Sequence, residues 1–104
     1  MAIREVLEEE LENSLRMEQR YSQELGKLPL GSLVQKNIKG HVYHYLVLRE
    51  AGRVKLVYKG KLDPKQVARY AEIKQQRAQY RGLRSKAREQ IRFIRRALRA
   101  KASV

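Results

Sequence analysis

The sequence predicts an α+β fold with an N-terminal helix, a three-stranded antiparallel meander and a long C-terminal helix that pairs with the first. Residues 2–25 contain neither Gly nor Pro and place apolar side chains on one helical face. Residues 32–60 alternate apolar and polar side chains around two short glycine-ended loops. Residues 63–101 return to helical periodicity. We expect one small domain over residues 1–104, with residues 26–31 as a linker.

The first predicted helix is acidic and amphipathic. Its apolar residues mostly recur four apart: Ile3, Val6, Leu7, Leu11, Leu15, Met17, Tyr21 and Leu25. Negative charge near a helix start is favoured by the helix dipole. Four glutamates occupy that part of the segment: Glu8, Glu9, Glu10 and Glu12. We therefore expect this helix to bury its apolar face and to present an acidic one.

The predicted meander has two hairpin loops. Residues 38–40 (Ile-Lys-Gly) and 50–52 (Glu-Ala-Gly) each fit a three-residue loop with Gly in the left-handed conformation, so that Arg49 pairs with Arg53. This register puts the apolar residues on one face: Val34, Val42, Leu46, Leu48, Val54, Leu56 and Tyr58. The opposite face then carries His41, Tyr43, Tyr45, Val47, Arg49, Arg53, Lys55, Val57 and Lys59. Such a small sheet needs a helix on its apolar face.

The last predicted helix has a complete start signal. Asp63 can cap it, Pro64 suits the first helical position, and Gln66 completes a capping-box pair. A seam with coiled-coil spacing follows: Tyr70, Ile73, Arg77, Tyr80, Arg84, Ala87, Ile91, Ile94 and Leu98. Gly82 lies inside this run and costs about 1 kcal/mol relative to Ala, which leaves open a bend or a break there.

The charge of the chain is large and unevenly spread. The formal net charge is +13. Residues 1–25 hold seven Glu against three Arg, whereas residues 26–104 hold 21 Lys or Arg against four acids. Residues 64–104 alone hold 13 basic and two acidic residues. A protein this far from neutrality suits a polyanionic partner, unless the acidic helix neutralises the basic one.

Several classes of protein are disfavoured. The absence of cysteine excludes disulfides and thiolate metal sites, and His41 and His44 point to opposite faces of a strand, so we expect no metal. No Ser-His-Asp order, carboxylate pair or glycine-rich phosphate loop is present, so we expect neither an enzyme nor a cofactor. No apolar run approaches the about 18–20 residues of a membrane span, and the acidic N-terminus is unlike a secretory signal. We expect a cytoplasmic protein without a membrane partner.

Two predicted surfaces suit nucleic acid. On the sheet, basic residues interleave with aromatic ones, as in surfaces that enter a groove or contact unpaired bases: Tyr43, Tyr45, Arg49, Arg53, Lys55 and Lys59. On the last helix, the candidates for phosphate contacts are Arg84, Arg88, Arg92, Arg95, Arg96 and Arg99. The alternatives are an aromatic pair that only stabilises the sheet, a solvated basic helix, and an amphipathic helix on an anionic membrane.

Part of the meander resembles a known pattern. The matching segments are residues 31–46 (GSLVQKNIKGHVYHYL), 49–55 (REAGRVK) and 58–62 (YKGKL), about a third of the chain. They resemble a family of short prokaryotic proteins and are similar to the small DNA-contacting N-terminal modules of some transposases and phage integrases. The resemblance implies a DNA-associated module from a mobile-element or defence locus. The chain lacks a recombinase catalytic region, so the module would act without one.

The sequence therefore predicts a non-enzymatic nucleic-acid-binding protein, with duplex DNA preferred over RNA. One alternative is an antitoxin-like or regulatory protein whose helical arm binds a protein partner or a second copy. Another is an RNA- or ribosome-associated protein, because arginine-rich helices also suit RNA.

Overall fold

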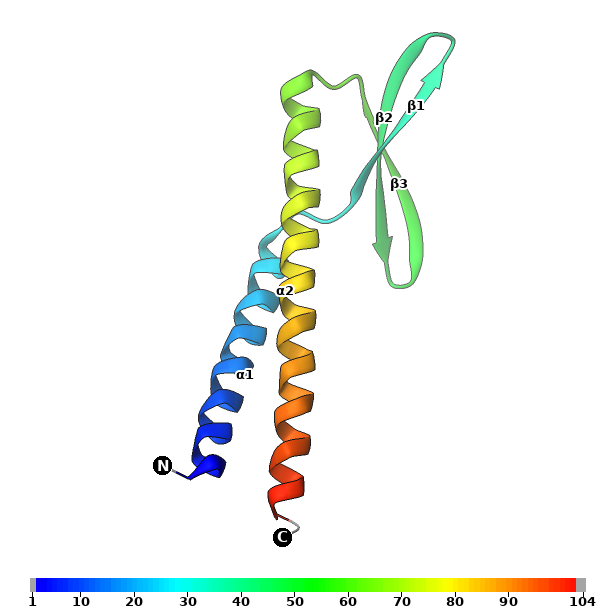
Figure 1. The fold of residues 1–104 in the computed structure, drawn as a ribbon. Coiled ribbons are helices and arrows are strands. Elements are labelled where there is room, and N and C mark those ends of the chain that lie inside the picture. Colours follow the sequence, from blue (N-terminus) through cyan, green and yellow to red (C-terminus); the bar gives the residue numbers. More distant parts are fainter. Residues whose placement is uncertain (1, 103–104) are drawn as a thin grey trace. The chain divides into compact units, whose positions relative to one another are not determined.

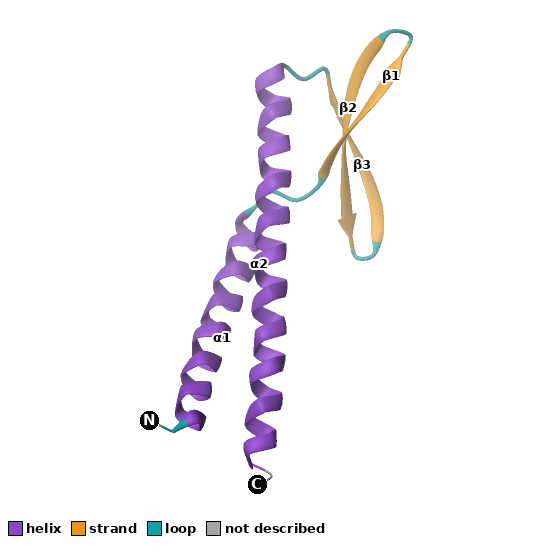
Figure 2. Cartoon of the chain, in the orientation of Figure 1, coloured by secondary structure: helices purple, strands orange, loops and turns teal. Residues whose placement is uncertain are grey.

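The computed structural model describes the backbone of residues 2–102 and the side chains as far as residue 100. The elements in chain order are α1 (Ile3–Lys27), β1 (Ser32–Ile38), β2 (His41–Glu50), β3 (Arg53–Gly60) and α2 (Pro64–Ala102) (Figure 1). The predicted α+β class is confirmed, with helices at both ends of the chain and the strands between them (Figure 2). The bounds differ from the predicted ones by one or two residues, and α1 continues through Gly26.

The elements form two compact units. One consists of α1 together with α2 from Arg77 onward, and the other extends from Leu28 to Gln76. The second unit therefore contains the sheet and the first turns of α2.

The first unit is an antiparallel pair of helices (Figure 1). Every predicted seam residue from Arg77 to Leu98 is buried or half-buried, which confirms the heptad spacing in this part of α2. The most buried apolar side chains are Ala87, Ile91 and Ile94. The rings of Tyr21 and Tyr80 lie with their centroids 6.3 Å apart and extend the contact between the helices.

The apolar face predicted for α1 is partly wrong. The side chains at Ile3, Val6, Leu15 and Met17 are exposed. The buried and half-buried residues instead include a row whose spacings alternate between four and three: Leu7, Leu11, Ser14, Glu18, Tyr21 and Leu25. Ser22 and Glu24 are also half-buried. The reason is geometric, because each step of four residues drifts about 40° around a helix with 3.6 residues per turn. Residues spaced by four therefore turn away from the contact with α2. The small polar Ser14 is buried in that contact.

The second unit contains the predicted meander, with strand order β1-β2-β3. Both hairpin loops have two residues and not three, because Ile38 pairs with His41 and Glu50 pairs with Arg53. The loop residues Lys39, Gly40, Ala51 and Gly52 have φ values of 51°, 81°, 50° and 78°. Positive φ at both loop positions is the type I′ geometry, whose twist matches that of the strands.

Each loop is one residue shorter than predicted. The side chains of β1 and β3 therefore lie on the opposite side of the sheet from the one that the predicted register gave them. Tyr45 pairs with Val34 on one side and with Tyr58 on the other. One side of the sheet, here called the tyrosine face, consists of Ser32, Val34, Lys36, Ile38, His41, Tyr43, Tyr45, Val47, Arg49, Val54, Leu56 and Tyr58. The predicted apolar face is therefore wrong for four members, which lie on the tyrosine face: Val34, Val54, Leu56 and Tyr58.

The inner face of the sheet, opposite the tyrosine face, carries the buried residues of β2. Leu46 and His44 are 8% and 6% exposed, and Leu33 pairs beside Leu46 from β1. The first turn of α2 borders this face, since His44 shares a hollow with Val67. The predicted start of α2 is confirmed. The backbone N–H of Asp63 donates to Gln66 Oε1 at 3.0 Å, and the backbone N–H of Gln66 donates to Asp63 Oδ1 at 2.9 Å.

Helix α2 is continuous through Gly82. Gly82 is exposed, its φ is not positive, and a Cβ added there meets nothing within 4 Å. We therefore expect Gly82→Ala to stabilise the protein by about 1 kcal/mol in a thermal or urea unfolding experiment. Gly52→Ala is the matched control, because the positive φ of Gly52 makes the same change cost about 1–2 kcal/mol. A loss of stability in Gly82→Ala would contradict this account.

Candidate nucleic-acid interface

The structure divides the basic cluster predicted on the sheet. Tyr43, Tyr45 and Arg49 lie on the tyrosine face as predicted. Arg53 and Lys55 lie on the inner face, because they pair with Glu50 and Leu48. The prediction of one surface with all six residues is therefore wrong, and the cause is the length of the second hairpin loop.

Lys59 lies at an irregularity in β3. Tyr58 pairs with Tyr45 and Gly60 pairs with His44, so Lys59 is an extra residue between two paired positions. Its side chain is exposed. The strand is therefore locally bulged next to the tyrosine face.

Three tyrosines form a cluster on the tyrosine face. The ring of Tyr58 lies 5.3 Å from that of Tyr45 and 6.3 Å from that of Tyr43, measured between centroids. Together with Ile38 they line a shallow hollow of about 540 Å³. The Nζ atom of Lys36 lies 5.6 Å from the centre of the Tyr45 ring, within the range of a cation–π contact.

A second hollow lies at the inner face, with a volume of about 630 Å³. His41 and His44 both line it, and the buried Nδ1 atom of His44 has no hydrogen-bond partner. Among the described residues no group of three or more His, Cys, Asp or Glu side chains lies close enough to hold a metal ion.

Helix α2 carries a straight row of arginines, here called the arginine stripe: Arg77, Arg81, Arg84, Arg88, Arg92, Arg95 and Arg99. Their spacings are four, three, four, four, three and four residues, so they fall within a sector about 80° wide at 3.6 residues per turn. The row is roughly 33 Å long at 1.5 Å per residue. Five of the seven are exposed, whereas Arg77 and Arg84 are half-buried beside the apolar seam.

The stripe contains five of the six residues predicted on this helix. Arg96 is the exception, because it lies about 40° beyond the nearest edge of the stripe. Arg77 and Arg81 were not predicted as site residues, although their spacing continues the row. The position of each arginine around the helix follows from its residue number at about 100° per residue, provided that the helix continues through Gly82. The sequence alone is therefore enough to find the stripe.

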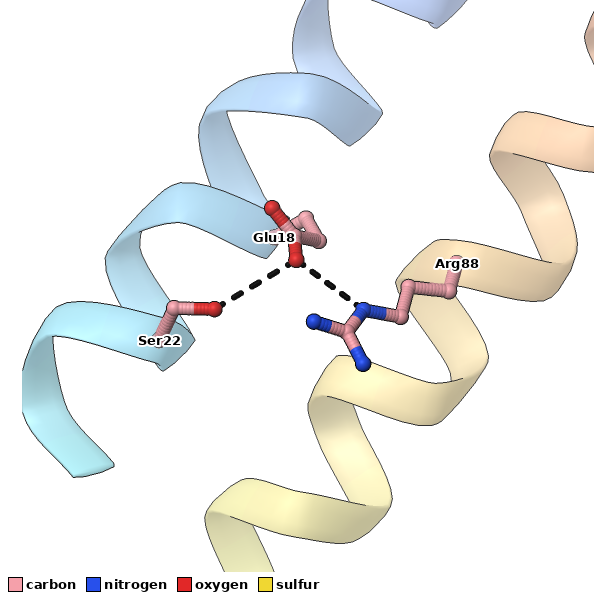
Figure 3. A network of polar contacts seen from close by, with 3 residues as sticks. All are labelled: Glu18, Ser22 and Arg88. Atoms are coloured by element: carbon pink, nitrogen blue, oxygen red, sulfur yellow. Dashed lines mark hydrogen bonds and ion pairs between the residues drawn. The ribbon is translucent and has the colours of Figure 1, made fainter. Parts of the chain in front are cut away.

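The acidic helix α1 contacts the stripe through an ion pair between Glu18 and Arg88. The Glu18 carboxylate accepts hydrogen bonds from Arg88 Nε at 3.0 Å and from Ser22 Oγ at 3.3 Å (Figure 3). The carboxylates of Glu8 and Glu24 pair within α1, with Arg4 and Lys27. Arg81, Arg92 and Arg95 remain exposed, so the positive charge of the stripe is displayed outward.

Comparison with protein-family models, with curated proteins and with solved structures finds no match to this chain. The similarity of residues 31–62 to transposase and integrase modules therefore stays a prediction, as do the absence of catalysis and the cytoplasmic location. Neither helix has, within residues 2–102, an apolar stretch of the length that crosses a membrane.

Proposed function

We propose that this protein is a non-enzymatic DNA-binding protein that holds duplex DNA through the arginine stripe of α2. One observation carries the proposal: seven arginines occupy a single narrow sector of a straight helix. Glu89 is the one acid in the sequence between Arg77 and Arg99, and its helical angle lies outside the stripe.

The dimensions of the stripe match a duplex. Double-stranded DNA carries about one negative charge per 1.7 Å of its axis. A row roughly 33 Å long covers close to one helical turn of about 34–36 Å. Arginine suits phosphate because its planar guanidinium can donate two parallel hydrogen bonds to two oxygens.

Duplex DNA is preferred over RNA for two reasons. A straight row of charges suits a stiff duplex, with a persistence length of about 50 nm for DNA, better than a flexible single-stranded RNA. In addition, the resemblance of residues 31–62 is to modules that contact DNA. Arginines on phosphates give affinity without sequence information, so we propose binding that depends little on sequence.

The test is the salt dependence of binding. The affinity for a labelled 20-base-pair duplex is measured by fluorescence anisotropy between about 50 and 200 mM salt. We expect log K to fall linearly with log[salt], with a slope of about −0.9 for each phosphate contacted and up to about −6 for the whole stripe. A flat plot would contradict the proposal, and an equal or higher affinity for double-stranded RNA would favour the RNA alternative.

A further inference from the structure

We propose that the tyrosine face of the sheet is a second nucleic-acid site, which binds unpaired bases by stacking them on Tyr43, Tyr45 and Tyr58. This site lies on the sheet and uses none of the arginines of α2. Binding of unpaired bases by the sheet is a separate activity from duplex binding by the arginine stripe. Either activity can be tested, and can fail, without the other.

The aromatic surface of the site is open. The side chain of Tyr58 is 58% exposed, although it contacts the rings of both Tyr43 and Tyr45. The three rings and Ile38 surround a shallow hollow that is open to solvent. Tyr43 and Tyr45 are half-buried and Tyr58 is exposed, so the cluster leaves aromatic surface in contact with solvent. A gathered aromatic surface of this kind suits an interaction site.

The charge of the tyrosine face suits an anion. Lys36 and Arg49 lie among its residues, and it contains no Asp or Glu. Lys36 lies over the Tyr45 ring through its cation–π contact, so a positive charge is held next to the tyrosine cluster. A ligand with flat apolar faces and regular negative charge satisfies both the rings and the cations.

Unpaired nucleotides fit this surface better than a duplex does. In a duplex the faces of the bases are covered by their neighbours, and proteins reach only the base edges in the grooves. A single strand exposes the faces, and tyrosine side chains stack on them with little preference for sequence. The register moves Arg53 and Lys55 away from the tyrosines, which leaves an aromatic platform with two cations instead of a basic surface for a groove.

A second copy of the chain fits the tyrosine face less well. Val54 and Leu56 are also exposed there, and apolar residues of this kind would suit a protein partner. However, a symmetric dimer through this face brings the same patch of both copies together. Because the face carries Lys36 and Arg49 and no acid, neither cation would meet an opposite charge on the other copy, which costs free energy.

The experiment compares wild type with Tyr58→Ala on a labelled 12-nucleotide oligothymidine and on a 12-base-pair duplex. The anisotropy titrations are made at about 300 mM salt, where phosphate contacts are weak and stacking persists. We expect Tyr58→Ala to bind the single strand about 10- to 100-fold more weakly. Tyr58→Phe, which keeps the ring, should stay within about 3-fold of wild type. Duplex affinity should stay within about 2-fold of wild type in both variants.

Two further variants separate this site from the stripe. Arg92→Gln combined with Arg95→Gln should weaken duplex binding but leave the high-salt binding of oligothymidine within about 2-fold of wild type. Equal losses on the single strand and the duplex in Tyr58→Ala would overturn the second site. Unchanged single-strand affinity in Tyr58→Ala would also overturn it, and a changed oligomeric state of that variant would assign the face to self-association.

Photo-crosslinking covers the case in which Tyr58→Ala unfolds, as judged by circular dichroism. The wild-type chain is irradiated with an oligonucleotide that contains 5-iodouridine, and the crosslinked residues are mapped by mass spectrometry. Crosslinks at Tyr43, Tyr45 or Tyr58 support the site. Crosslinks confined to α2, or none, overturn it.

Discussion

Replacing Arg92 and Arg95 by Gln lowers the affinity for duplex DNA roughly 10- to 100-fold at about 100 mM salt, if the stripe binds phosphates. Each arginine on a phosphate displaces nearly one counterion, so the plot of log K against log[salt] also becomes shallower by about two. Both side chains are exposed, and their replacement leaves the apolar seam of α2 intact. Anisotropy titrations at several salt concentrations measure the affinity and the slope together.

The matched control removes the same charge from the same unit but away from the stripe. Lys86 lies on the opposite side of α2, and Arg20 of α1 lines a hollow with Gln90, on the flank of the helix pair away from Arg88. Replacing both by Gln lowers the net charge by two, as the stripe variant does. We expect the affinity for duplex DNA to fall less than about 5-fold, because this variant lowers only the overall positive potential of the protein. Equal losses in the two variants would show that net charge, and not the stripe, determines binding.

Gly31→Ala destabilises the second unit by about 2–4 kcal/mol, the sum of backbone strain and overpacking. The φ of Gly31 is 100°, a region that L-residues rarely adopt. An added Cβ would also lie 2.7 Å from Leu48 Cδ2 and 2.8 Å from Leu46 Cγ, and Leu46 belongs to the buried inner face. Near-UV circular dichroism during urea unfolding reports the loss, because most of the tyrosines lie in this unit.

Gly26→Ala is the control for that substitution. Gly26 lies in the last turns of α1, its φ is not positive, and an added Cβ meets nothing within 4 Å. The change should alter the free energy of unfolding by less than about 1 kcal/mol, in the stabilising direction. A loss in Gly31→Ala no greater than the change in Gly26→Ala would disprove the close packing at the entry to β1.

The helices were predictable because their patterns repeat over many residues. The seam from Arg77 to Leu98 covers about six turns, so single errors of spacing have little effect on it. Asp63, Pro64 and Gln66 set the start of α2 through local chemistry alone. The contact side of α1 was harder to predict, since Ser14 is polar and replaces the apolar residues that periodicity favours.

The sheet register could not be obtained from the hydrophobic pattern. A loop ending in glycine fits both a three-residue turn and a type I′ turn, and the two differ by one residue in register. The three-residue loop gives the more apolar inner face, so the pattern favoured it. The structure instead places Lys39 and Ala51 at positive φ, and it moves Tyr58 next to Tyr45. One residue of loop length therefore decides whether Tyr43 and Tyr45 share their face with Arg53 and Lys55 or with Tyr58.

The type I′ turn at Ala51 and Gly52 also shows how this surface could change during evolution. One residue inserted between Glu50 and Ala51, with the two-residue turn kept, would exchange Val54, Leu56 and Tyr58 on the tyrosine face for Arg53, Lys55 and Val57. No substitution would be needed to convert an aromatic platform into a cationic one. Two descendants of one gene could therefore differ in ligand while their strands remain identical.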